Sequence, residues 1–105
     1  MLPSQWLDKP EKWTQGCQAR DKYGNEVFIA DQKVCHWCAI GAINLMAIKN
    51  NDFVTCEKYC DKLCETVGPI PVWNDAKERT WEEVHAALVE TERRLGLLEN
   101  VNESA

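Results

Sequence analysis

The sequence has no surplus of positive charge, no long apolar run and no internal repeat. Its 12 basic residues against 17 acidic ones give a net charge of −5. A net-negative small domain repels the phosphates of nucleic acid, so nucleic-acid binding is not expected. The longest apolar stretch covers residues 39–48 and is interrupted by Asn44. A helix needs about 20 apolar residues to span a bilayer, so we expect no membrane segment.

The first residues also lack the pattern of a secretory signal. Residues 1–13 contain no basic segment followed by an apolar run. Without secretion, the six cysteines are expected to stay reduced, because the cytosol keeps thiols reduced. We therefore expect a cytoplasmic protein.

The chain does have enough apolar material for one small core. Of its 105 residues, 45% are hydrophobic and five are tryptophan. This length fits a single domain over residues 1–105. We predict an ordered core over residues 11–96, followed by a frayed tail over residues 97–105.

The residue pattern predicts a mainly α-helical domain with three main helices and a minor N-terminal β-hairpin. Gly24-Asn25 has the chemistry of a turn, and it separates two stretches that read as extended arms, residues 13–20 and 26–29. Before them, Ser4 is expected to cap a short helical turn.

A central helix is predicted from Lys33 to Ile48, with Asp31 as its N-cap. Apolar residues recur there at steps of three and four, which is helical spacing. Within this helix, Gly41 would let another element approach closely. The recurring residues are Val34, Trp37, Cys38, Gly41, Ala42 and Leu45.

Two further helices are predicted in the second half of the chain. A turn and cap at residues 50–52 precede a helix over residues 53–66, which Gly68 and the prolines after it end. Thr80 and Glu83 form a capping box at the start of the last helix. The predicted apolar face of the 53–66 helix consists of Phe53, Cys56, Cys60, Leu63, Cys64 and Val67.

Four cysteines have a spacing that suits a structural zinc site. Cys35, Cys38, Cys56 and Cys60 read C-x2-C-x17-C-x3-C. However, both pairs fall on apolar faces of predicted helices, where free cysteine packs like a small hydrophobic residue. Core packing is the preferred interpretation and zinc is the alternative; no other cofactor is expected.

Two reactive interpretations of the cysteines have less support. Cys35 is near the predicted helix start, where the helix dipole lowers a thiol pKa. Redox CxxC motifs, however, normally follow a strand in a βαβ unit, and the sequence shows no such unit. A Cys–His nucleophile is not predicted either, because His36 would leave the helix in another direction and His85 is on another helix.

The second informative stretch is Trp73-Asn74-Asp75 with Arg79. Asn and Asp side chains favour local bonds to the backbone, so a tight turn anchored by Trp73 explains these residue types. The alternative is a pocket in which Asn74, Asp75 and Arg79, with Trp13 or Trp73, bind a small anion. Arg79 could also pair with Asp75, and its planar fork suits phosphate or carboxylate.

Several short motifs occur in an order that resembles a family of small uncharacterised proteins from actinobacteria and bacteriophages. The motifs are WTQG at residues 13–16, ARD at 19–21 with Gly24, WC at 37–38 with Gly41-Ala42, and WND at 73–75 with Arg79-Thr80 and Glu83-Val84. The resemblance covers residues 11–95 and brings no established activity. It implies a phage or mobile-element origin. The family pattern has a cysteine at Cys38 but does not require Cys35, Cys56, Cys60 or Cys64, which weakens the zinc interpretation.

No set of residues typical of catalysis emerges, so an enzyme is not expected. We expect a non-enzymatic, phage-encoded binding protein that inhibits a host protein or defence component in the host cytoplasm. The alternatives are a zinc-stabilised module with a four-cysteine site and a binder of a small anionic ligand. The candidate binding residues are Trp13, Trp73, Asn74, Asp75 and Arg79.

Overall fold

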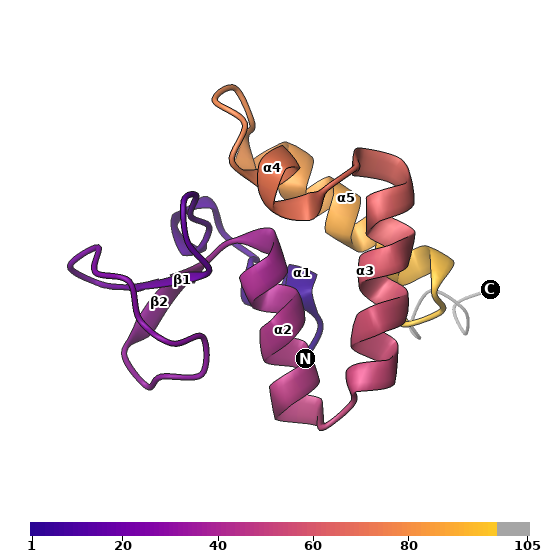
Figure 1. Cartoon of the computed structure of the whole chain (residues 1–105), viewed down its shortest axis with the longest axis horizontal. Helices are drawn as coiled ribbons and strands as arrows, with labels where there is room; N and C mark the ends of the chain where they lie inside the picture. Colours follow the sequence, from indigo (N-terminus) through magenta and orange to yellow (C-terminus); the bar gives the residue numbers. More distant parts are fainter. Residues whose placement is uncertain (99–105) are drawn as a thin grey trace.

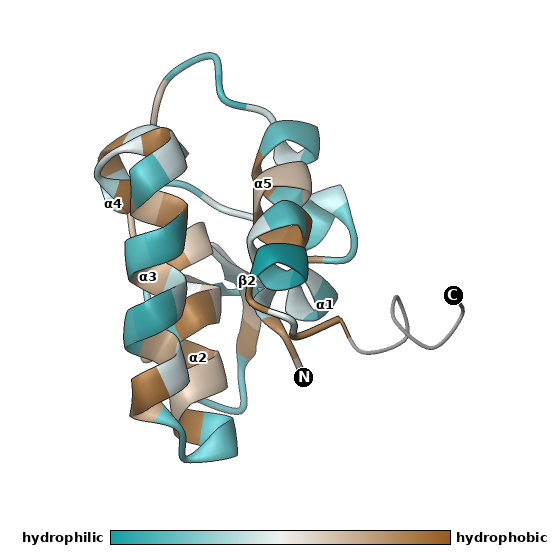
Figure 2. Ribbon diagram, turned by 90° about the vertical axis from the view of Figure 1, so that its right-hand side faces the viewer, coloured by the Kyte–Doolittle hydropathy of each residue, from teal (hydrophilic) through white to brown (hydrophobic). Residues whose placement is uncertain are grey.

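The protein is described here by a computed structural model that covers residues 1–98. Helices α2 and α3 lie side by side, and α1 and α5 lie behind them as a second layer (Figures 1 and 2). A small two-stranded antiparallel sheet projects on the other side of α2 (Figure 1). This arrangement confirms the predicted mainly helical fold with a minor hairpin. The elements are α1 (Pro3–Trp6), the 3₁₀ turn η1 (Pro10–Lys12), β1 (Ala19–Asp21), β2 (Val34–Trp37), α2 (Ala39–Asn50), α3 (Phe53–Val67), α4 (Ile70–Asn74) and α5 (Trp81–Arg94).

The central helix begins later than predicted. Residues 34–37 form β2, and α2 starts only at Ala39. Its N-cap is Cys38 instead of Asp31, and the Cys38 Sγ accepts a hydrogen bond from Gly41 N at 3.3 Å. The helical spacing was misleading because β1 offers these residues a pairing partner, and tertiary pairing overrides a local pattern.

The predicted hairpin turn is present, but the main partner of β1 differs from the predicted arm. Gly24 has a φ of +88°, which favours glycine, and its N–H donates to Asp21 O at 3.0 Å. β1 pairs antiparallel with β2, with Arg20 opposite His36. The predicted second arm, residues 26–29, makes one bridge to β1, between Glu26 and Arg20.

Helices α3 and α5 begin at the predicted caps. Asp52 Oδ1 accepts a hydrogen bond from Thr55 N at 3.0 Å at the start of α3. The capping box of α5 is formed as predicted: Thr80 N donates to Glu83 Oε1 at 3.0 Å, and Glu83 N donates to Thr80 Oγ1 at 3.3 Å. The short helix α4 occupies the stretch that was predicted to be a connector.

The buried face of α3 differs from the predicted one. Phe53 and Cys64 were expected in the core, but both are exposed. Leu63 is fully buried as predicted, and Tyr59, which is not part of the predicted face, is fully buried as well. Tyr59 can be buried because its hydroxyl donates to Glu92 Oε2 on α5 at 2.7 Å.

The N-terminal turn is attached to the far end of the chain. Ser4 is not a cap: it is buried, its Oγ donates to Glu92 Oε1 at 2.5 Å and its N–H donates to Glu92 Oε2 at 2.9 Å. Trp81 Nε1 donates to Leu7 O at 2.8 Å, which fixes the end of α1. These bonds hold α1 on α5, and Leu7 lies in the core.

The predicted tail is only partly covered by the structure. Leu97 packs against the core, and residues 99–105 lie outside the described residues. Within residues 1–98, no helix has the length and apolar character needed to cross a membrane.

Candidate functional site

Asn74 lies at the centre of a contact between two distant segments. It ends α4 and is fully buried. Its Oδ1 accepts hydrogen bonds from Trp13 Nε1 at 2.8 Å and from Ala39 N at 2.9 Å. Its Nδ2 donates to Thr14 O at 3.2 Å and to Asp75 Oδ1 at 2.9 Å. One side-chain amide therefore joins the segment before β1 to α4 and to the start of α2.

The WTQG segment adds further hydrogen bonds at the same place. Gln15 Nε2 donates to Asn74 O at 2.8 Å and to Ala76 O at 3.0 Å. Gly16 N donates to Asp75 Oδ1 at 3.0 Å. The WTQG and WND motifs are thus joined by hydrogen bonds that involve both backbone and side-chain atoms.

We call residues 13–16 and 74–76 the clasp, and residues 17–37 the hairpin lobe. The clasp lies where the hairpin lobe meets the helical core. Beside it, Gly41 packs directly on the lobe, because a Cβ at this position would lie 2.1 Å from Gln18 O. The predicted close approach at Gly41 is confirmed.

Arg20 links the clasp to the hairpin turn. Its Nε donates to Thr14 Oγ1 at 2.9 Å, and its Nη2 donates to Gln15 O at 2.9 Å. Its Nη1 donates to Gly24 O at 3.0 Å. The sequence had given Arg20 no role of its own, although its place in the ARD motif after WTQG was an available signal.

Arg79 lies outside the clasp hydrogen bonds. Its Nε donates to Trp73 O at 2.9 Å, and its guanidinium carbon is 5.1 Å from the centre of the Trp73 ring, which is cation–π geometry. Its ion pair is with Glu83 at 3.5 Å, whereas Asp75 had been the expected partner. The predicted residues thus form two groups: Trp13, Asn74 and Asp75 in the clasp, and Trp73 with Arg79. Binding of a small anion here stays a prediction.

The four cysteines of the predicted zinc site lie in different environments. Cys35 is exposed on β2, whereas Cys38 is buried at the start of α2. Cys56 and Cys60 are partly buried on α3. Among the residues that the structure describes, no group of three or more His, Cys, Asp or Glu side chains could hold a metal ion. A zinc site stays a hypothesis, which metal analysis of the purified protein would test.

Burial makes three of the thiols poor nucleophiles. It raises the pKa of Cys38 and of Cys56 above the ordinary value and raises the pKa of Cys60 to about 12. The two histidines have partners other than cysteine. His36 Nδ1 contacts Glu11 O, and the ring of His85 stacks on Trp81 with 5.0 Å between ring centres.

The loops of the hairpin lobe present two large side chains to solvent. Tyr23 is 77% exposed and Phe28 is 67% exposed. Both loops are braced: Asp21 Oδ1 accepts from Tyr23 N at 2.9 Å, and Trp37 Nε1 donates to Ile29 O at 3.1 Å. Sequence reasoning placed these aromatics in a hairpin without assigning them a role. For Tyr23, its position beside the turn residue Gly24 was the signal for exposure.

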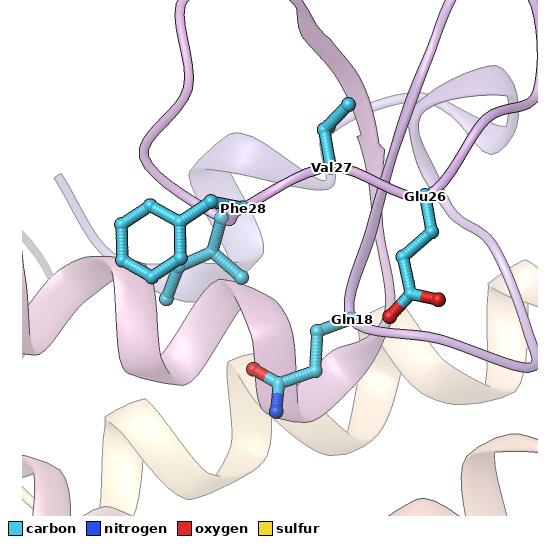
Figure 3. Close-up of a pocket in the computed structure, with 5 residues that line it drawn as sticks. Gln18, Glu26, Val27 and Phe28 are labelled. Atoms are coloured by element: carbon cyan, nitrogen blue, oxygen red, sulfur yellow. The ribbon is translucent and has the colours of Figure 1, made fainter.

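A hollow of about 420 Å³ lies beside the second of these loops (Figure 3). It is open to solvent and has both polar and apolar walls. Figure 3 shows Glu26 and Val27 pointing to opposite sides of the loop. The residues that line the hollow are Gln18, Glu26, Val27, Phe28 and Ile29.

Comparison with known proteins gives a family but no activity. No curated protein and no solved structure matches the chain. A family of unknown function, DUF6197, matches residues 4–94, which include the clasp, the hairpin lobe and helices α2 to α5. The chain therefore belongs to the DUF6197 family.

Proposed function

We propose that this chain is a non-enzymatic binding protein, encoded by a bacteriophage, that inhibits a host protein or defence component in the host cytoplasm. The phage origin rests on the resemblance of the WTQG, WC-x-x-GA and WND motifs to phage and actinobacterial proteins. Residues of the WTQG and WND motifs are hydrogen bonded to one another in the clasp. This supports a role for the clasp in holding the hairpin lobe.

The observation that carries the proposal is the braced pair of exposed aromatic side chains on the lobe. Tyr23 and Phe28 stand on loops whose backbones are already hydrogen bonded. Exposed aromatics on ordered loops are typical anchors of protein interfaces, because they bury large areas and lose little conformational entropy on binding. The negative net charge favours a partner with a basic surface.

Affinity capture with matched variants tests the proposal. The tagged protein is incubated with lysate of an actinobacterial host, and bound proteins are measured by quantitative mass spectrometry. We expect a specific host protein whose recovery falls at least about tenfold with Tyr23→Ser combined with Phe28→Ser, since anchor residues often contribute more than 1.4 kcal/mol.

Val72→Ser is the matched control, because Val72 is 71% exposed on α4, outside the lobe. This variant should capture the same protein as the wild type. Recovery that is unaffected by the lobe variant, or that falls equally in the control, would contradict a binding surface on the hairpin lobe.

A further inference from the structure

Residues 25–27, which follow the hairpin turn, act as an additional strand at the edge of the sheet. Asp21 N donates to Asn25 O at 2.9 Å, and Val27 N donates to Ala19 O at 3.1 Å. These bonds flank the antiparallel bridge between Arg20 and Glu26. β1 is therefore paired on one side with β2 and on the other with residues 25–27.

The outer side of this segment has unpaired backbone groups. In an antiparallel pair, consecutive residues direct their backbone groups to opposite sides. Since Asn25 and Val27 bond to β1, Glu26 and Phe28 face away from it. Within residues 1–98, no hydrogen-bond partner is found for the N–H or C=O of Glu26 or for the N–H of Phe28. An exposed edge of this kind is a template for another strand.

The side chains next to this edge indicate what such a strand would carry. Phe28 is largely exposed and offers an apolar surface. Glu26 is exposed, and no ion pair involves it in the described part of the chain. Both residues line the open hollow of about 420 Å³ together with Gln18, so space exists next to their side chains (Figure 3).

We propose that the edge at residues 26–28 binds an extended segment of the partner protein as an added strand. The segment would place an apolar side chain against Phe28 and a basic side chain against Glu26, which gives complementary charge. Backbone hydrogen bonds to Glu26 and Phe28 supply the pairing, as in other cases of strand addition. This inference rests on the proposed function, because it names how the same lobe recognises its partner.

A displayed library of random dodecapeptides provides the probe. The wild-type protein is panned against the library, with Phe28→Ser as the decoy, and the enriched peptides are synthesised. Amide hydrogen exchange is then measured by NMR with and without peptide. We expect peptides that alternate apolar and basic residues. Bound peptide should slow exchange at Glu26 and Phe28 at least about tenfold, while Val27 changes little because its N–H already bonds to Ala19.

Three results would overturn strand addition. The first is the absence of any peptide enriched over the Phe28→Ser decoy. The second is binding that leaves exchange at Glu26 and Phe28 unchanged. The third is protection of these amides that rises with protein concentration in the absence of peptide, because the occupant would then be a second copy of this chain.

Variants at residue 26 separate this inference from the proposed function once a host partner is captured. Glu26→Pro removes the outward N–H and should lower affinity at least about tenfold. Glu26→Ala keeps the N–H and should lower it only about two- to threefold, as expected for an exposed ion pair. If the Tyr23 and Phe28 variants abolish capture but Glu26→Pro does not, strand addition fails and the proposed function stands. Thermal unfolding checks that Glu26→Pro folds. If this variant does not fold, the hydrogen exchange of the wild-type protein with bound peptide decides whether a strand is added.

Discussion

Replacement of Asn74 by alanine should destabilise the protein strongly without touching the apolar core. The substitution leaves Ala39 N–H unpaired in a fully buried position and Trp13 Nε1–H unpaired in a partly buried one. It also removes the donor to Thr14 O. Each buried group without a partner costs about 1–3 kcal/mol, so we expect Asn74→Ala to lower the free energy of unfolding by about 3–5 kcal/mol. That is a large part of the roughly 5–15 kcal/mol typical of a domain.

Urea unfolding followed by tryptophan fluorescence measures this loss. With a slope of about 2 kcal/mol per molar urea, the midpoint should fall by about 2 M. Asn50→Ala is the matched control, because Asn50 is exposed at the end of α2 and its substitution should change stability by about 0.5 kcal/mol at most. A loss below about 1 kcal/mol for Asn74→Ala would refute the energetic role assigned to the clasp.

A double-mutant cycle tests the central bond directly. Trp13→Phe keeps an aromatic ring but removes the indole N–H that donates to Asn74. Once that donor is absent, Asn74→Ala no longer leaves it unpaired. The double variant should therefore lose about 1–2 kcal/mol less than the sum of the single variants. Strict additivity would show that the two side chains are not coupled.

Three further predictions concern single positions. Gly41→Ala should lower the free energy of unfolding by about 2 kcal/mol or more, although alanine has the better helix propensity, because the new Cβ would lie 2.1 Å from Gln18 O. A higher stability of this variant in urea unfolding would contradict the close approach. The free energy of unfolding should fall as pH rises past about 10, because Tyr59 ionises there in the unfolded chain, whereas burial raises its pKa in the folded protein. Tyr59→Phe should flatten this alkaline slope in urea titrations at several pH values, and an unchanged slope would assign it to other groups. Cys35 should react with iodoacetamide at least about tenfold faster than Cys60, because Cys35 is exposed and burial raises the Cys60 pKa to about 12. Peptide mass spectrometry measures the two rates, and equal rates would contradict this prediction. Metal analysis of the same sample tests for zinc.

The parts of the fold that depend on local chemistry could be predicted from the sequence. The capping box of α5 needs only Thr80 and Glu83, and the cap of α3 needs only Asp52, so both helices begin where expected. Gly24 supplies a turn by its own conformational freedom. In each case the residues that make the bond lie within a few positions of one another.

The parts that depend on distant partners were missed. Residues 34–37 have helical spacing, yet they pair with β1, which the pattern inside the segment cannot reveal. Tyr59 is buried because Glu92, on another helix, accepts a hydrogen bond from its hydroxyl group. Asn74 was expected to bond locally in a tight turn, whereas it ends helix α4. Its bonds to Trp13 and Ala39 follow only from the packing of three separate segments.

The bonds that complete this fold also constrain the order in which it can form. Helices α2 and α3 are consecutive in the chain and can pair early, because closing a short loop is fast. The bond between Trp13 and Asn74 spans 61 positions, and the one between Ser4 and Glu92 spans 88. On the ribosome, the clasp therefore cannot form until residue 74 has emerged, and the bonds that hold the N-terminal turn on α5 cannot form until α5 is nearly complete. Until then the first third of the newly made chain carries its tryptophans without their final contacts, which makes it the segment most dependent on rapid completion of synthesis or on a chaperone.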